Sequence, residues 1–273
     1  MKDVIVHNWD QLQEVIFKGV WDEKLMRYRS NFIYRGVCDK QYGLMPKLNW
    51  TCSHNLELES SLLRNFKKYA YADIGDNKSF WQMLSLAQHY GLPTRLLDWT
   101  YSPLVAAHFA TENINEYDRD GVIWCVNFVK LNDQLPPVLK EALRDQSSNS
   151  FTVEMLETYV GDFEQLKAQA NKPYVLFFEP ASMLDRIANQ YALFSVVSDA
   201  KTTLTDLLPE DSDIWFRIII PKEVKLEIRD KLDYINISER LIYPGLDGIC
   251  KWITRRYSDL GPKFNATRKN IDL

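Results

Sequence analysis

The stretch Gln88-His-Tyr-Gly-Leu-Pro-Thr-Arg-Leu-Leu-Asp-Trp-Thr-Tyr-Ser-Pro103 links the end of one predicted helix to the start of another through a short extended segment. Gly91 and Pro93 end the first helix. Ser102 followed by Pro103 begins the second, because serine caps a helix N-terminus and proline suits the first helical turn. The stretch therefore predicts a helix–strand–helix unit that places charged side chains beside apolar ones.

Helices and strands are predicted on both sides of this unit. Helices are expected at residues 8–20, 57–71, 79–90, 103–110, 182–188 and 224–232 and after the 244–248 turn, and strands at 31–37, 95–100, 121–129, 174–178, 192–197 and 214–220. Strict strand–helix alternation is absent, so a doubly wound sheet is not expected. The pattern predicts a single α+β domain over residues 1–273, with a polar helical segment at 135–171 as an insertion or a lid.

Composition limits the classes of function. The 33 basic and 37 acidic residues give a net charge of −4, which disfavours a globally basic nucleic-acid binder but leaves room for a local basic patch. The 4 cysteines are scattered, and neither a signal peptide nor an apolar run of about 20 residues is present, so a cytoplasmic protein without a membrane span is expected. The 13 Phe, 14 Tyr and 8 Trp fill either a core or a pocket.

The common catalytic signatures are absent. The sequence has no G-x-G-x-x-G, no G-x-x-x-x-G-K-[ST] and no G-x-S-x-G, which argues against Rossmann, P-loop and serine-hydrolase chemistry. The 4 histidines are far apart in sequence, and no Cys/His cluster has metal-ligand spacing, so no metal is expected.

The opening stretch holds several candidate site residues. Arg95 and Asp98 lie among apolar neighbours, and because buried charge without a partner is costly, they are expected to pair with each other or with a ligand. His89 is a candidate for either a hydrogen-bonded structural role or catalysis. Ser102 is an N-cap that can also contact a ligand.

Two short motifs outside this stretch extend it into a family pattern. Phe32-Ile-Tyr-Arg-Gly36, the Q-H-Y-G-L-P-T-R-L-L-D-W-T run and Ser102-Pro-Leu-Val-Ala-Ala-His-Phe-Ala110 together resemble the FRG domain family, with Tyr34 where the first aromatic residue of the F-R-G motif is found. Arg186-Ile-Ala-Asn-Gln-Tyr-Ala-Leu-Phe194 and Tyr243-Pro-Gly-Leu-Asp-Gly248 are further matches. The resemblance covers roughly residues 25 to 256.

More distantly, the order of motifs is similar to that of mono- and poly-ADP-ribosyltransferases. Ile33-Tyr-Arg-Gly36 resembles their first strand, and Trp99–Ala110 resembles their second strand and following helix. Asn189-Gln-Tyr-Ala-Leu-Phe194 stands where those enzymes carry a catalytic glutamate. The resemblance implies a split β-sheet core surrounded by helices, NAD as a substrate and transfer of ADP-ribose to a macromolecule.

This resemblance assigns roles to particular residues. Arg35, Gln190 and Asp98 are the expected catalytic residues. An arginine fork suits a diphosphate, hydroxyls at a helix N-terminus suit anions or sugars, and aromatic rings suit nicotinamide or adenine. The expected NAD-binding residues are Tyr34, Gly36, His89, Tyr90, Arg95, Trp99, Thr100 and Ser102, with Tyr101 as a further stacking candidate.

An enzyme of this kind needs a negative charge near the reacting ribose, and Gln190 does not supply one. Its carbonyl can accept a hydrogen bond from a ribose hydroxyl but carries no charge to stabilise an oxocarbenium-like state. Either another acid supplies that charge, or the activity is altered or lost. The candidate acids are Asp98, Glu179, Glu239 and Asp247. The structural alternative for Arg35 and Gln190 is a hydrogen bond that braces the sheet.

Partners follow from the same resemblance. The acceptor is RNA or protein, the implied context is a bacterial toxin or anti-phage effector, and a neutralising antitoxin is a further partner. Two basic clusters are available for nucleic acid or are simply solvated helix faces: Arg64, Lys67 and Lys68; and Lys251, Arg255, Arg256, Lys263, Arg268 and Lys269. The alternative functions are a non-catalytic nucleotide- or partner-binding module and a nuclease-like or hydrolytic enzyme that uses His89 and Asp98.

Overall fold

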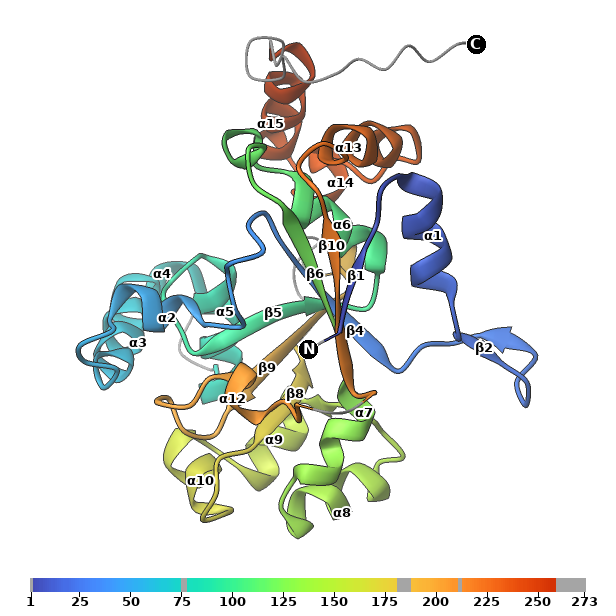
Figure 1. The fold of residues 1–273 in the computed structure, drawn as a ribbon. Helices are drawn as coiled ribbons and strands as arrows, with labels where there is room; N and C mark the ends of the chain where they lie inside the picture. Colours follow the sequence, from blue (N-terminus) through green and yellow to red (C-terminus); the bar gives the residue numbers. More distant parts are fainter. Residues whose placement is uncertain (1, 75–77, 181–187, 211–212, 259–273) are drawn as a thin grey trace, which may run out of the picture.

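A computed structural model describes residues 2–74, 78–180, 188–210 and 213–258. These residues form a large mixed sheet with helices packed around it (Figure 1). In spatial order, its strands are β1 (Asp3–Ile5), β10 (Trp215–Ile220), β6 (Gly121–Asn127), β4 (Phe32–Val37), β5 (Leu96–Thr100), β9 (Ala192–Val197), β8 (Val175–Glu179) and β7 (Phe151–Thr152). A small hairpin of β2 (Trp21–Asp22) and β3 (Arg27–Tyr28) extends to one side. The predicted α+β class is confirmed.

The sheet is weakest at its centre, between β4 and β5. β4 pairs with β6 over six residues and β5 pairs with β9 over five, but β4 and β5 share only the pair Tyr34–Thr100. Each pairing is antiparallel, whereas the outer strands β1 and β7 pair in parallel with β10 and β8. The sheet therefore consists of two well-paired halves that meet at one point.

Helices surround both halves. They are α1 (Trp9–Phe17), α2 (Lys47–Thr51), α3 (Leu58–Tyr69), α4 (Tyr71–Ile74), α5 (Phe80–His89), α6 (Pro103–Thr111), α7 (Phe128–Leu131), α8 (Pro137–Asp145), α9 (Val153–Tyr159), α10 (Phe163–Ala168), α12 (Leu204–Leu207), α13 (Lys225–Tyr234), α14 (Glu239–Ile242) and α15 (Leu246–Tyr257). Short 3-10 turns lie at Ile114–Glu116 and Asn132–Gln134. α13, α14 and α15 gather at one end of the sheet (Figure 1). None of the helices in the described part of the chain is long and apolar enough to cross a membrane.

The core is divided in the same way as the sheet. One face of the sheet carries a core that spans both halves, from Ile33 on β4 to Phe177 on β8. The opposite face carries two separate cores, one with α1, α6 and α13 and one with α3, α5, α8, α9 and α10. Trp124, Phe177 and Trp215 on the strands are buried, and so is Phe128 at the start of α7. The junction of β4 and β5 lies between the two separate cores.

Local sequence signals account for the helix starts nearest this junction. At α5, the Ser79 side chain accepts from the backbone of Gln82, and the Gln82 side chain accepts from the Ser79 backbone, which is a capping box. At α6, the Ser102 hydroxyl accepts from the Val105 backbone, and Pro103 is the first helical residue. Both starts agree with the prediction. The helix expected at 182–188 lies almost entirely outside the described residues.

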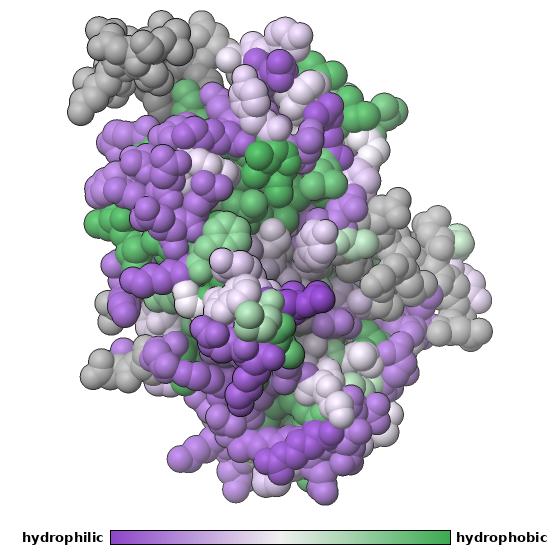
Figure 2. Space-filling model, turned by 90° about the vertical axis from the view of Figure 1, so that its right-hand side faces the viewer, coloured by the Kyte–Doolittle hydropathy of each residue, from purple (hydrophilic) through white to green (hydrophobic). Residues whose placement is uncertain are grey.

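The segment 135–171 packs into the core of the half of the sheet that contains β5, β9, β8 and β7. Its buried side chains include Leu139, Phe151, Leu156 and Leu166. It also supplies β7, a two-residue edge strand paired with β8. The exposed residues of this segment are mostly polar. The face of the molecule in Figure 2 is largely hydrophilic, with apolar residues gathered in patches.

Candidate functional site

A cavity of about 380 Å³ opens where β4 meets β5, and we call it the junction pocket. Its lining comes from β4, the end of α5, β5, α6 and the start of β9. The lining residues are Tyr34, Arg35, Gly36, Gln88, His89, Tyr90, Gly91, Asp98, Trp99, Thr100, Phe109, Gln190, Ala192 and Phe194. The three catalytic candidates therefore share one pocket, with every predicted binding residue except Arg95 and Ser102.

Arg35 connects the two halves of the sheet. Its Nη1 donates to the main-chain oxygen of Asp98 at 2.7 Å and lies 3.7 Å from the Asp98 carboxylate. β4 and β5 share only one backbone pair, and this side-chain contact connects them beyond it. Burial lowers the pKa of Arg35 below its ordinary value, although the negative charge of Asp98 partly opposes this shift. The arginine thus braces the sheet and also faces the pocket.

Asp98 is oriented by a short hydrogen-bond chain. Its Oδ2 accepts from Gln88 Nε2 at 2.8 Å, and Gln88 Oε1 accepts from the Thr94 hydroxyl at 2.6 Å. The Thr94 hydroxyl in turn accepts from the Leu96 backbone. The Asp98 side chain is 55% exposed, so its carboxylate remains accessible to a ligand. Sequence reasoning missed Gln88, although it begins the Q-H-Y-G run.

The expected pairing of Arg95 with Asp98 is wrong. Arg95 Nε donates to Glu59 on α3 at 2.6 Å, and its backbone N–H donates to the same carboxylate at 2.8 Å. The guanidinium also lies 3.6 Å from the Phe163 ring centroid. Successive strand residues point to opposite faces, and Arg95 and Asp98 are three positions apart, so their side chains diverge. Arg95 fastens α3 to the sheet and does not line the pocket.

Two hydroxyls lie at the start of α6. The Thr100 hydroxyl accepts from the Ser102 backbone at 3.0 Å and lines the pocket. The Ser102 hydroxyl accepts from the Val105 backbone at 3.3 Å. Ser102 thus serves as the N-cap, and among the described pocket residues Thr100 supplies the hydroxyl at this helix start.

The predicted stacking residues divide into buried and exposed rings. Trp99 is 2% exposed, and its Nε1 donates to Ser195 in the core. Tyr34 is also buried, and this burial raises its pKa to about 12. Tyr101 donates to Glu179 and does not line the pocket. Tyr90 is the exposed ring, with His89 edge-on against it at 5.2 Å. Tyr34, Trp99 and Tyr101 are therefore held by packing or by hydrogen bonds within the protein, and Tyr34 and Trp99 also line the pocket.

Gly36 is required by packing within the protein. A Cβ atom at this position would lie 1.8 Å from the Ala106 carbonyl oxygen on α6. Gly36 therefore permits a close approach between strand β4 and helix α6, and it also lines the pocket. That approach places Arg35 and the start of α6 at the same pocket.

Gln190 is held by the C-terminal helices. Its Nε2 donates to the Ile242 main-chain oxygen at 3.1 Å, and Asn189 Nδ2 donates to that of Leu241 at 3.0 Å. Because the amide nitrogen of Gln190 faces α14, Oε1 is the atom of this side chain that a ligand hydroxyl can contact. Tyr191 follows with a φ of 49°, a strained conformation for a non-glycine residue.

The four candidate acids are separated by the fold. Glu179 accepts from the hydroxyls of Tyr101 and Ser150, and Glu239 is paired with Arg255 at 2.5 Å. Asp247 lies exposed on α15. Asp98 is the acid that the structure places among the described lining residues of the junction pocket. In the described ranges, no group of three or more His, Cys, Asp or Glu side chains is arranged to hold a metal ion.

Comparison with protein families gives one match. Residues 30–119 match the model of the FRG domain. The matched range contains Arg35 and the whole Gln88–Pro103 stretch, whereas Gln190 lies outside it. No curated protein and no solved structure matches the chain.

Proposed function

Because this chain contains an FRG domain and three separate segments meet at its junction pocket, we propose that the pocket binds NAD and that the protein transfers ADP-ribose to a macromolecule. The observation that carries the proposal is the convergence of Arg35, Thr100 and Gln190, which are up to 155 residues apart (190 − 35), on one cavity. Its volume of about 380 Å³ is within the usual range for ligand sites.

The sheet supports the same proposal. The expected ADP-ribosyltransferase-like core is a split sheet, and the single β4–β5 pair divides this sheet at the pocket. The strands that carry the first two motifs, β4 and β5, and the strand after the third, β9, are neighbours in the sheet. This order lets side chains from all three reach one ligand.

Each lining residue has a chemical role in the proposal. Arg35 presents a guanidinium to the diphosphate, and Thr100 offers a hydroxyl at the start of α6. Tyr90 offers an exposed ring for stacking a base. Gln190 Oε1 accepts from a ribose hydroxyl. NAD supplies a ribosyl bond whose cleavage passes through an oxocarbenium-like transition state.

Asp98 supplies the charge that Gln190 lacks. Its carboxylate lines the same pocket, and Gln88 fixes its orientation. A negative charge near a developing cation stabilises the transition state, and a preformed hydrogen bond avoids reorganisation during the reaction. The proposed catalytic set is therefore Arg35, Asp98 and Gln190, with Gln88 as a positioning residue.

Release of nicotinamide tests this proposal. The purified protein is incubated with NAD, and free nicotinamide is measured for the wild type, Arg35→Ala, Asp98→Asn and Gln190→Ala. Loss of the Arg35 donor is expected to slow release by about 100-fold or more. Arg27→Ala, an exposed arginine on β3, is the matched control and is expected to retain full activity.

The binding-module alternative gives a different result. If NAD raises the melting temperature of the wild type but no nicotinamide is released with RNA or protein acceptors, the pocket binds without catalysis. If NAD changes neither quantity, both nucleotide functions are wrong. A toxin or anti-phage effector is the proposed context, and wild-type expression is then expected to slow host growth while Arg35→Ala does not.

A further inference from the structure

A second and larger hollow, of about 660 Å³, lies among α13, α14 and α15. We call it the C-terminal hollow. It is lined mainly by arginines and aromatic rings, among them Arg229, Tyr234, Arg240, Trp252, Arg255 and Arg256. Three helices that are close together in sequence thus build a surface rich in two residue types that contact nucleic acids.

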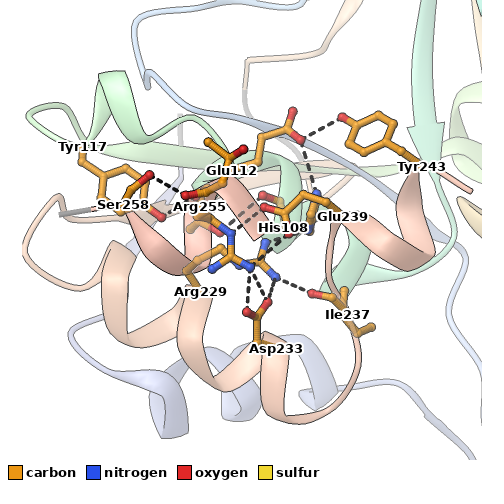
Figure 3. Close-up of polar contacts among 12 residues, drawn as sticks. His108, Glu112, Tyr117, Arg229, Asp233, Ile237, Glu239, Tyr243, Arg255 and Ser258 are labelled. Atoms are coloured by element: carbon orange, nitrogen blue, oxygen red, sulfur yellow. Dashed lines mark hydrogen bonds and ion pairs between the residues drawn. The ribbon is translucent and has the colours of Figure 1, made fainter. Parts of the chain in front are cut away.

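The floor of the hollow is a closed charge network (Figure 3). Arg255 Nη2 donates to both carboxylate oxygens of Asp233, at 2.7 and 2.6 Å, and its Nε donates to Glu239 at 2.5 Å. Arg229 Nη2 donates to Asp233 and to the Ile237 main-chain oxygen. Two arginines face two carboxylates, so the floor is balanced in charge and its donors are largely used within the protein.

The floor is also tied to α6. Burial lowers the pKa of His108, and the charge of Arg229 lowers it further, so the ring is neutral at pH 7 although Glu112 acts in the opposite direction. Arg229 Nη1 lies 2.6 Å from His108 Nδ1, which accepts because arginine only donates. His108 Nε2 then faces Glu112 at 3.3 Å, and Glu112 also accepts from Tyr243 at 2.8 Å. Through these contacts the network reaches α6, the helix that begins at the junction pocket.

The rim of the hollow differs from its floor. Arg240 and Arg256 are exposed and lie 4.1 and 5.3 Å from the Trp252 ring centroid. Tyr234 is 91% exposed. Asp230 is the exposed carboxylate among the described lining residues. The rim therefore presents two guanidinium groups against one carboxylate, with aromatic rings between them.

We propose that the C-terminal hollow binds single-stranded RNA and that RNA is the acceptor. This inference rests on the proposed function of the junction pocket. Phosphates would contact Arg240 and Arg256, and unstacked bases would stack on the Tyr234 ring and on the guanidinium planes that Trp252 supports. The net charge of −4 does not oppose this, because a local field decides where a strand binds.

The distribution of charge favours a strand over a small anion. The Nη atoms of Arg229 are bonded to His108 and Asp233, and Nε and Nη2 of Arg255 are bonded to Glu239 and Asp233, so a lone phosphate would meet mainly the exposed rim. Binding through separate rim charges and separate rings suits an extended ligand with repeating phosphates and bases. A duplex hides its base faces and would lose the stacking contacts.

Helix α14 connects the hollow with the junction pocket, because Arg240 on this helix lines the hollow and Gln190, which contacts the end of the helix, lines the junction pocket. Ile242, at the end of α14, accepts from Gln190. Tyr243, the next residue, lies 6.5 Å from the ring of Phe109, which lines the junction pocket. An RNA strand bound in the hollow is therefore near the junction pocket, where the ADP-ribosyl group would be formed.

Fluorescence anisotropy with a labelled single-stranded RNA of about 12 nucleotides, without NAD, tests the proposal. Arg240→Gln combined with Arg256→Gln is expected to weaken binding by about tenfold or more and to reduce the salt slope by about 1.4, for two lost phosphate contacts. Asp230→Asn is expected to tighten binding, because it removes the carboxylate at the rim.

The matched control removes the same charge elsewhere. Arg64→Gln combined with Lys68→Gln removes two exposed cations from α3 and is expected to leave RNA affinity unchanged. Trp252→Leu removes the ring on which both rim guanidinium groups lie and is expected to weaken binding about fivefold or more. Circular dichroism of each variant checks that a loss of affinity does not come from unfolding.

Several results would overturn the proposal. They are no binding by the wild type at low salt, equal loss in the α3 control, full competition by AMP, and equal affinity for duplex RNA. The two proposals fail separately, because RNA binding is measured without NAD and nicotinamide release without RNA. The rim double variant is expected to keep its NAD-induced shift in melting temperature.

Discussion

The junction pocket and the C-terminal hollow use charge in opposite ways. In the junction pocket, Asp98 is held by one glutamine and is still 55% exposed. In the hollow, Arg255 and Glu239 are 9% and 5% exposed at the side chain and are bonded to each other. A half-exposed charge can be used by a ligand, whereas a paired and buried charge mainly fixes the structure. The difference separates a charge that is open to a ligand from the buried network beneath the hollow, which supports its exposed rim.

Gly36→Ala is expected to have the largest effect, because it disrupts the junction itself. The new methyl group would lie 1.8 Å from a backbone oxygen of α6, which cannot move aside as a side chain can. We expect a loss of more than about 4 kcal/mol in the free energy of unfolding, measured in urea. Gly43→Ala is the control, since its nearest atom is 3.8 Å away. Equal stability of the two variants would disprove the packing role.

Arg255→Met tests the scaffold side of the comparison. It leaves the carboxylates of Asp233 and Glu239 without their strongest partner, at a cost of about 3–4 kcal/mol. Lys231→Met breaks the exposed pair with Glu227 and is expected to change stability little. Thermal denaturation with and without NAD should show that Arg255→Met lowers stability. A variant as stable as the wild type would mean that the network is not a scaffold.

The smallest expected effect concerns pH and His108. Burial lowers the pKa of this histidine in the folded protein, so the unfolded chain binds more protons below its ordinary value of 6.5. The contribution of His108 to stability is therefore fully present above about pH 6.5 and decreases as the pH falls below this value, by at most about 1.4 kcal/mol for each pH unit. The free energy of unfolding is measured in urea at about pH 7.5 and at about pH 5.5, one pH unit above and one below the ordinary pKa of histidine. The difference between the two values measures the lost stability.

His108→Gln provides the control for this pH effect. Glutamine can accept from Arg229 through Oε1 and donate to Glu112 through Nε2, and it does not titrate. Its stability is expected to change less than that of the wild type between the two pH values. An identical decrease in both proteins would assign the pH effect to other groups.

Much of the fold follows from local sequence. β-branched and aromatic runs predicted β4, β6 and β10, and the Ser102–Pro103 pair predicted the start of α6. The strands β1 and β7 have three and two residues, which is too short for a periodic pattern. They exist because the edges of the sheet offer backbone partners, and this is information about tertiary structure.

The candidate site was predictable in its members but not in their partners. The motif segments placed Arg35, Asp98 and Gln190 together, yet Arg95 pairs with Glu59, a residue 36 positions earlier. Nothing in the Gln88–Pro103 stretch indicates that partner. The partners were not predictable in the C-terminal hollow either. Arg255 belongs to a basic run in the sequence, but its guanidinium donates to the buried carboxylates of Glu239 and Asp233.

The most direct test of the account is a crystal structure of the protein soaked with NAD. We predict NAD in the junction pocket, with its diphosphate within hydrogen-bond distance of Arg35 and a ribose hydroxyl on Gln190. NAD bound in the C-terminal hollow instead, or an empty junction pocket at saturating NAD, would contradict the account.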